Sequence, residues 1–171
     1  MVKLAGAVMI VGATAAVGAG AVMRLRRRVG LLAALIAAFG MMKSEICSAA
    51  APLRDVMELL AERAETPARP LFQEVCRGMS AIGSLPFSTI WSRAAETVCG
   101  ELLTAEERES VQSVGGALGH YDAAWQAEAI DRALRRLESF RAEAEAAYRR
   151  DARLHAFMGV AAGVFTVILF I

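Results

Sequence analysis

Residues 4–23 read LAGAVMIVGATAAVGAGAVM, an uncharged run of 20 residues in a chain of 171. A helix rises about 1.5 Å per residue, so this run is long enough to span the roughly 30 Å hydrocarbon core of a bilayer. A second apolar run, Leu154–Ile171, has His155 as its strongly polar side chain. The two runs predict transmembrane helices at residues 1–23 and 154–171, with a central domain at residues 24–153 between them.

Basic side chains gather at the inner ends of both runs. They are Arg24, Arg26, Arg27 and Arg28 after the first run, and Arg149, Arg150 and Arg153 around the start of the second. Because Lys and Arg next to a span are retained in the cytoplasm, we expect the central domain inside the cell and both chain ends outside. A cleaved signal peptide is the alternative, since Ala19-Gly20-Ala21 resembles a cleavage site. The positive charge of a signal peptide, however, precedes its apolar run, whereas here most of the positive charge follows the run.

The charges of the chain are unevenly distributed. Residues 29–148 contain 11 basic and 17 acidic side chains, a net charge of −6, although the whole chain has a net charge of +1. An acidic domain with basic ends suits an anionic membrane surface, so the lipid bilayer is an expected partner. A net charge of only +1 excludes a strongly basic nucleic-acid-binding protein, and a hydrophobic fraction of 56% excludes a disordered chain.

Apolar residues at steps of three and four, bounded by Pro and Gly, predict six helices in the central domain. We expect them at residues 29–50, from Pro52 to Thr66, from Leu71 to Ile82 before a left-handed Gly83, from Phe87 to Gly100, from Thr104 to near Gly119, and from Asp122 to Tyr148. The short connections predict antiparallel neighbours. The predicted fold class is therefore all-α, a six-helix bundle-like cytoplasmic domain flanked by two transmembrane helices.

The last predicted helix is the longest, and the sequence leaves open whether it continues into the second apolar run. Its stripe of Ile130, Ala133, Leu137, Phe140, Ala144 and Ala147 is expected to pack on the domain's own helices, with a homo-oligomeric coiled coil as the alternative. Three ion pairs four residues apart are expected along it: Glu128–Arg132, Asp131–Arg135 and Glu145–Arg149.

Three local features lead to specific expectations. Thr104-Ala-Glu-Glu107 has the pattern of a capping box. Asp122 is expected to be the N-cap of the long helix. The competing hypothesis is that Asp122 and Gln126, one turn apart, belong to a partner site. Trp91 is expected to be buried, and a partner contact would explain it if it were exposed.

Catalytic motifs are absent from the sequence, which has no P-loop, H-E-x-x-H or G-x-S-x-G pattern. We therefore expect no catalytic, cofactor-binding or metal-binding residues, and a protein that is not an enzyme. Cys47, Cys76 and Cys99 are interpreted as small buried hydrophobic residues, and Glu106-Glu107 as a solvated helix face. Gly115 and Gly119 lie one helical turn apart, a spacing that favours close helix approach over a phosphate cradle.

One long motif resembles the signature of the stage III sporulation protein AB family. It reads Gly115-x-x-Leu118-Gly119-x-x-Asp122-x-x-x-Gln126-x-x-x-Ile130-x-x-x-Leu134-x-x-Leu137-Glu138. Glu45-Ile46, Pro52-Leu53 and Ala95 after Trp91 are further matches, so the resemblance covers essentially the whole chain. Ala51 departs from the pattern, because the family tends to have a hydroxyl side chain before the proline. The second helix is therefore expected to begin without a side-chain cap.

The resemblance implies a function. Proteins of this family belong to the mother-cell side of the channel that joins mother cell and forespore, and their soluble part is similar to the cytoplasmic domain of type II secretion and type IV pilus platform proteins. The implied role is a non-enzymatic platform in the outer forespore membrane that links a secretion-type ATPase to the other stage III channel proteins. Gly115, Leu118, Gly119, Asp122 and Gln126 are the candidate interaction residues.

Two other classes were considered from the residues alone. A generic two-span membrane scaffold unrelated to sporulation would share the same layout of spans and helices. A membrane-bound enzyme would need a cluster of polar side chains inside the bundle, and the sequence offers no such cluster.

Overall fold

The computed structural model describes the backbone of residues 2–49, 51–81, 83–118 and 122–170, and the side chains of residues 20–47, 51–80, 83–118, 122–151 and 154. This part of the chain contains six α-helices and no strand, which confirms the all-α prediction. The helices are α1 (Val2–Ser44), α2 (Leu53–Arg63), α3 (Arg69–Gly78), α4 (Phe87–Cys99), α5 (Ala105–Ala117) and α6 (Ala123–Phe170). A π-helical turn, Glu45–Ala49, follows α1, and a 3-10 turn, Met79–Ala81, follows α3.

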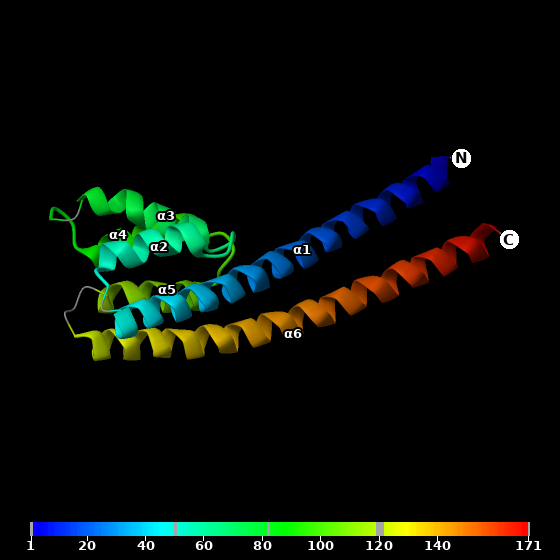
Figure 1. Ribbon diagram of the computed structural model, residues 1–171. Helices are drawn as coiled ribbons and strands as arrows, with labels where there is room; N and C mark the ends of the chain where they lie inside the picture. Colours follow the sequence, from blue (N-terminus) through cyan, green and yellow to red (C-terminus); the bar gives the residue numbers. More distant parts are fainter. Residues whose placement is uncertain (1, 50, 82, 119–121, 171) are drawn as a thin grey trace. The chain divides into compact units, whose positions relative to one another are not determined.

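The chain divides into two compact units. Arg28–Ala142 forms one unit, called here the bundle. Met1–Arg27 and Glu143–Ile171 form the other, called here the terminal unit. Within the bundle the chain reverses direction at each turn from α1 to α6, as Figure 1 shows, and α2 packs on α3, α3 on α4 and α4 on α5.

The first and last helices are longer than the periodicity of the central domain predicts. The first apolar run and the helix expected at residues 29–50 form the single helix α1, because Arg24–Gly30 contains no proline to interrupt it. Likewise α6 continues without a break past Tyr148 to Phe170. The question left open by the sequence is thus answered for the backbone: α6 runs unbroken into the second apolar run.

One described stretch, Gly20–Cys47, which runs from α1 into the π-helical turn, is long and apolar enough to cross a bilayer by length and composition. Its apolar window is 44% buried within the protein. Most of the side chains of the two predicted spans, residues 1–23 and 154–171, lie outside the described residues. The two-span layout therefore stays a prediction.

Trp91 of α4 lies at the centre of the bundle and is fully buried, as expected. Three aromatic rings surround it, each with its centroid 6.1 Å from that of the indole: Phe39 of α1, Phe72 of α3 and Phe87 of α4. The indole Nε1–H donates a hydrogen bond to the carbonyl oxygen of Val111 in α5, at 2.8 Å. One side chain thus joins four helices and has its polar atom satisfied.

Gly115 of α5 lies directly against this indole. A Cβ atom at Gly115 would overlap the Cδ1, Cγ and Cβ atoms of Trp91, so the helix backbone can approach the ring only because no side chain intervenes. Its neighbour Gly116 faces outward, and a Cβ atom there would meet nothing within 4 Å. The prediction that Gly115 serves close helix approach is confirmed, whereas Gly119 lies outside the described residues.

Several local predictions are confirmed by the helix ends. Gly83 has a φ of 109°, as a residue in a left-handed turn requires. Helix α2 begins after Pro52 without a side-chain cap, as expected from Ala51. The third helix is shorter than predicted, since α3 ends at Gly78 and tightens into the 3-10 turn. Ile82 lies outside the described residues.

The predictions for two of the three cysteines and for Asp131 were wrong. Cys99 is buried, but Cys76 is half-buried and Cys47 is exposed, so the three cysteines are not a common set of core residues. Cys47 falls in the π-helical turn, where about one extra residue per turn rotates the helix face away from the core. Asp131 bonds to Lys43 of α1 at 2.7 Å rather than to Arg135. The Glu128–Arg132 and Glu145–Arg149 pairs are present as predicted.

The two adjacent glycines provide a test of this core. We expect Gly115→Ala to lower the free energy of unfolding by about 1–3 kcal/mol, because the added methyl group collides with the Trp91 ring. We expect Gly116→Ala to be neutral or to stabilise by about 0.5 kcal/mol, because the methyl group has room and a helix favours Ala over Gly. Urea denaturation of the full chain in detergent, followed by tryptophan fluorescence, measures both. Equal effects of the two substitutions would contradict the described core.

Candidate functional site

The predicted interaction motif begins inside the bundle. Leu118 is buried, and Gly115 is occupied by its contact with Trp91. Both residues therefore hold α5 in place and are not available to a partner. The surface that a partner can reach must come from the neighbours of these residues on α5 and from the start of α6.

Asp122 caps α6, as the capping hypothesis predicts. Its carboxylate Oδ1 accepts hydrogen bonds from the backbone N–H groups of Ala124 at 2.9 Å and Trp125 at 3.3 Å. Its carbonyl oxygen accepts a bond from the N–H of Gln126 at 3.0 Å. The Gln126 side chain is half-buried. A structural role thus accounts for Asp122, while its participation with Gln126 in a partner site stays a hypothesis.

The predicted capping box opens α5. The Thr104 hydroxyl accepts a hydrogen bond from the N–H of Glu107 at 3.3 Å, and the Glu107 carboxylate accepts one from the N–H of Thr104 at 2.8 Å. The interpretation of Glu107 as part of a solvated face was wrong, because this residue is fully buried. Its carboxylate needs further partners once it is removed from water.

Arg28 supplies those partners from α1. Its Nε lies 3.0 Å from both Glu107 oxygens and its Nη2 lies 2.6 Å from Oε1, a two-pronged ion pair. Sequence analysis placed Arg28 among the membrane-flanking basic residues. In the structure its guanidinium lies within the bundle and is paired there. The pair links the start of the bundle portion of α1 to the first turn of α5.

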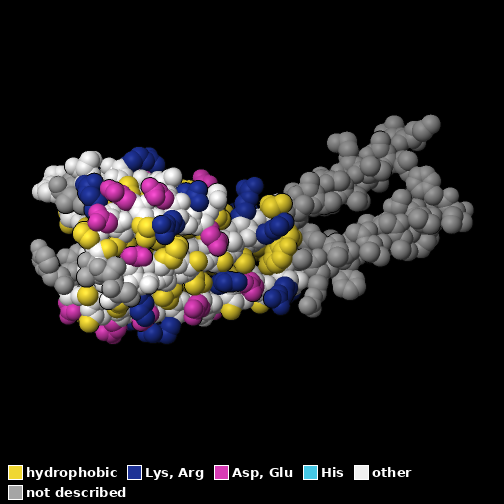
Figure 2. All heavy atoms as spheres, in the orientation of Figure 1, with side chains coloured by type: hydrophobic (Ala, Val, Ile, Leu, Met, Phe, Trp, Pro, Cys, Tyr) yellow, Lys and Arg dark blue, Asp and Glu magenta, His cyan; other side chains and the backbone are white. Residues whose placement is uncertain are grey.

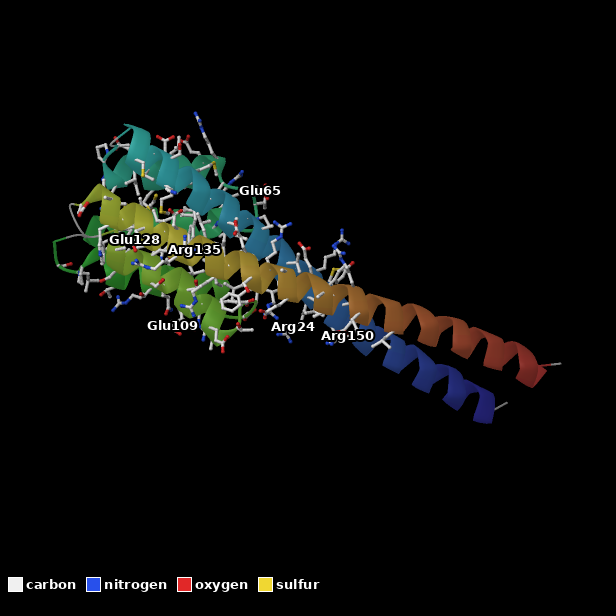
Figure 3. The ribbon with its side chains drawn as sticks, turned by 90° about the horizontal axis from the view of Figure 1, so that it is seen from below. Arg24, Glu65, Glu109, Glu128, Arg135 and Arg150 are labelled. Carbon is white, nitrogen blue, oxygen red and sulfur yellow. The ribbon has the colours of Figure 1, made fainter. Side chains whose placement is uncertain are left out.

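The other predicted membrane-flanking residues lie in the terminal unit. Arg24, Arg26 and Arg27 are exposed on α1, and Arg149 and Arg150 are exposed on α6. Figure 3 shows Arg24 and Arg150 at a similar level along the two helices. The side chain of Arg153 lies outside the described residues.

Exposed hydrophobic side chains accompany these arginines. Met23 is 47% exposed and Leu154 is 54% exposed, and both belong to the terminal unit. Figure 2 shows basic and hydrophobic side chains together where the described side chains end. A guanidinium beside an exposed apolar side chain is the arrangement found where a helix meets a membrane interface.

A groove lies between α5 and α6 within the bundle, with a volume of about 420 Å³. Small residues form its floor: Gly116 and Ala117 from α5, and Ala129 and Ala133 from α6. Ser113, Trp125, Arg132 and Arg136 complete its lining. Trp125 is 43% exposed, the one large hydrophobic side chain of the bundle, among the residues described, that is so accessible.

The charged side chains of the groove are held by neighbours on α6. Arg132 pairs with Glu128 at 2.7 Å, and the Arg136 guanidinium lies 6.0 Å from the centre of the Phe140 ring. The groove was not predicted from the sequence. The available signal was that Trp125 shares a helix face with Glu128, Arg132 and Arg136, at steps of three and four, rather than with the buried stripe.

The described residues bring together no set of three His, Cys, Asp or Glu side chains that could hold a metal ion. Burial raises the pKa of the Cys99 thiol to about 12, chiefly through desolvation. Desolvation also raises the pKa of Cys76, assisted by the nearby charge of Glu58. At neutral pH both residues are therefore protonated thiols, which are weak nucleophiles.

Comparisons with known proteins agree on one family. The family described as stage III sporulation protein AB matches residues 3–171. Stage III sporulation protein AB of Bacillus subtilis (strain 168) is 29% identical over 170 residues, which cover 99% of each chain. A solved structure of a stage III sporulation protein AB superposes with a TM-score of 0.64 at 27% identity, covering 72% of this chain and 97% of that one.

The buried carboxylate can be tested against its exposed neighbour. We expect Glu107→Gln to lower the free energy of unfolding by about 2 kcal/mol, because it breaks a buried ion pair whose Arg28 partner is only partly solvated. Glu106→Gln in the same helical turn should change it by less than about 0.5 kcal/mol. Chemical denaturation of the two variants measures the difference. A loss for Glu106→Gln as large as that for Glu107→Gln would show that the effect comes from the helix terminus and not from the ion pair.

The two hypotheses for Asp122 make different predictions. If it acts as a cap, Asp122→Ala costs about 1 kcal/mol while Asp122→Ser, which retains a capping oxygen, costs little. Both variants should then support sporulation to the extent that they fold. A serine variant with a normal melting temperature and lost sporulation would instead assign Asp122 to a partner surface.

Proposed function

Because the chain belongs to the stage III sporulation protein AB family, we propose that it acts in sporulation as a non-enzymatic membrane platform. The bundle is the cytoplasmic body of this platform, and the apolar ends of α1 and α6 are its two membrane spans. The family match covers residues 3–171, so a scaffold unrelated to sporulation is no longer a useful alternative.

The observation that carries the proposal is the continuity of α1 and α6. Each of these helices belongs both to the bundle and to the terminal unit, and each reaches an apolar run without a break. The two chain ends lie at the same end of the terminal unit (Figure 1). In this proposal the cytoplasmic body and its spans share the same two continuous helices, α1 and α6.

The charges support the orientation that we propose. The exposed arginines of the terminal unit precede or follow the apolar runs on the side of the central domain. Because such cations are retained in the cytoplasm, we propose that residues 24–153 are cytoplasmic, on the mother-cell side of the outer forespore membrane. Anionic head groups would add about 1 kcal/mol of attraction for each arginine near the surface.

The partners that we propose are a secretion-type ATPase and the other stage III channel proteins. Such a platform needs a well-packed body, together with a surface for its partner. The contacts of Trp91 with its surrounding rings and with Val111, together with the Arg28–Glu107 pair, hold this body together, since they join α1, α3, α4 and α5. Self-association of the platform is compatible with this role.

The platform function is tested by locating the ATPase. In sporulating cells that contain the chain, we expect the ATPase to fractionate with membranes and to co-purify with the tagged full-length protein. In a deletion strain it should move to the soluble fraction, and the full-length chain should restore both its membrane association and sporulation. An ATPase that stays with the membrane in the deletion strain would contradict the proposed link.

The three cysteines test the orientation. In intact cells that carry the chain in the plasma membrane, a membrane-impermeant maleimide should modify none of Cys47, Cys76 and Cys99, whereas a permeant maleimide should modify Cys47. After lysis the impermeant reagent should reach Cys47. Cys99 should react only after denaturation, because its pKa of about 12 leaves little thiolate at neutral pH.

Added cysteines at the chain ends are the control for labelling. Val2→Cys and Phe170→Cys should each react with the impermeant reagent in intact cells. If the original thiols react in intact cells and the added ones do not, the orientation is inverted. Labelling of only one of the two ends would mean that the chain crosses the membrane once.

A further inference from the structure

We propose that the groove between α5 and α6 is the docking site for an amphipathic helix of a cytoplasmic partner that carries acidic side chains beside its apolar stripe. The inference rests on the proposed platform function, because it assigns the face that the platform presents. It goes beyond that function in two respects. It names the surface involved, which consists of the groove floor, Trp125, Arg132 and Arg136, and it names carboxylates as the groups recognised.

The floor of the groove suits the close approach of a helix. Gly116, Ala117, Ala129 and Ala133 offer two helix surfaces with no large side chain, and helices pack closely where such residues meet. The fold does not require glycine at position 116, where a Cβ atom would meet nothing. Alanine would be the better helix former there, so a glycine at this site is better explained by something that approaches from outside.

Trp125 gives the groove an anchor. It is 43% exposed although it lies in the bundle, where the other large hydrophobic side chains among the described residues are covered. Aromatic side chains beside a groove are the usual anchors of helix-binding surfaces, because each buries a large apolar area at low cost in side-chain entropy. The apolar stripe of the incoming helix would cover Trp125 and the small residues.

The positive charges of Arg132 and Arg136 favour an acidic occupant of the groove. Arg132 and Arg136 lie on the same side of α6 as Trp125 and line the groove. Among the described residues, one carboxylate pairs with Arg132, that of Glu128, and Arg136 is held by its contact with Phe140. A second copy of the chain using the same face would present two arginines and one carboxylate, that of Glu128, which already pairs with Arg132. Acidic side chains flanking an apolar stripe would pair with both arginines.

A lipid surface is a poorer occupant than a protein helix. Trp125 belongs to the bundle and precedes Leu154 by 29 residues on α6. The exposed apolar residues expected at the membrane, Met23 and Leu154, belong to the terminal unit instead. Trp125 is thus the exposed apolar residue that membrane contact does not explain.

Site-specific crosslinking in sporulating cells tests the assignment. The full-length chain carries benzoylphenylalanine at Trp125 or, as the control, at Gln73, which is exposed on α3. We expect a protein adduct from position 125 alone, whose crosslinked peptide has apolar residues at steps of three and four and at least two flanking acidic residues. An adduct with a second copy of the chain, with lipid alone, or from position 73 in place of 125 would overturn the inference.

Charge reversal provides a matched pair of variants. Arg132→Glu and Arg54→Glu each replace an arginine that is about half exposed and paired with a glutamate four residues away. Any loss of stability should therefore be similar. We expect Arg132→Glu to lower the crosslinking yield by about tenfold and to impair sporulation, whereas Arg54→Glu does neither. Equal effects of the two changes would overturn the inference.

Failure of the inference can be distinguished from failure of the platform function. If the ATPase leaves the membrane in the deletion strain, yet the groove variants retain it there and crosslink normally, the platform stands and the groove is wrong. If the membrane association of the ATPase does not depend on the chain, the platform proposal fails whatever position 125 contacts.

Discussion

Trp91 constrains the bundle more than any other side chain described. Its indole is buried against rings from α1, α3 and α4, and its one polar atom bonds to the backbone of α5. Such a ring leaves α5 very little freedom, because the helix must present a residue without a side chain, Gly115, where it meets the ring. The position of α5, and with it the α5 wall of the groove, thus depends on one contact in the core.

The Arg28–Glu107 pair acts at the other end of the same helix. Glu107 completes the capping box of α5 and at the same time binds the guanidinium that enters the bundle on α1. A carboxylate buried without those partners would destabilise the fold by several kcal/mol. The first turn of α5 is therefore positioned by α1, the helix that we propose to enter the membrane.

Much of the fold was predictable because its signals are local. The capping box at Thr104, the turn at Gly83 and the cap at Asp122 each depend on residues within a few positions, and all three are present. Contacts across the sequence were not predictable in this way. Nothing near Glu107 indicates that its partner is Arg28, 79 positions away, nor that Asp131 would bond to Lys43 of α1 rather than to its own helical neighbour. Cys47 was misplaced because one π-helical turn shifts the helix face, and the groove was missed because it exists only where α5 and α6 lie together.

The two tryptophans of the chain differ in burial: Trp91 lies in the core of the bundle, and Trp125, which is 43% exposed, is the residue that we propose to meet the partner. Acrylamide quenching of tryptophan fluorescence measures this division directly, on the full chain and on Trp125→Phe. The account predicts that the full chain contains one accessible and one protected fluorophore, that Trp125→Phe leaves only the protected one, and that the crosslinked partner, once purified and added, shields the accessible one. A Trp125→Phe protein that is quenched as readily as the full chain, or a bound partner that leaves the quenching of Trp125 unchanged, would contradict it.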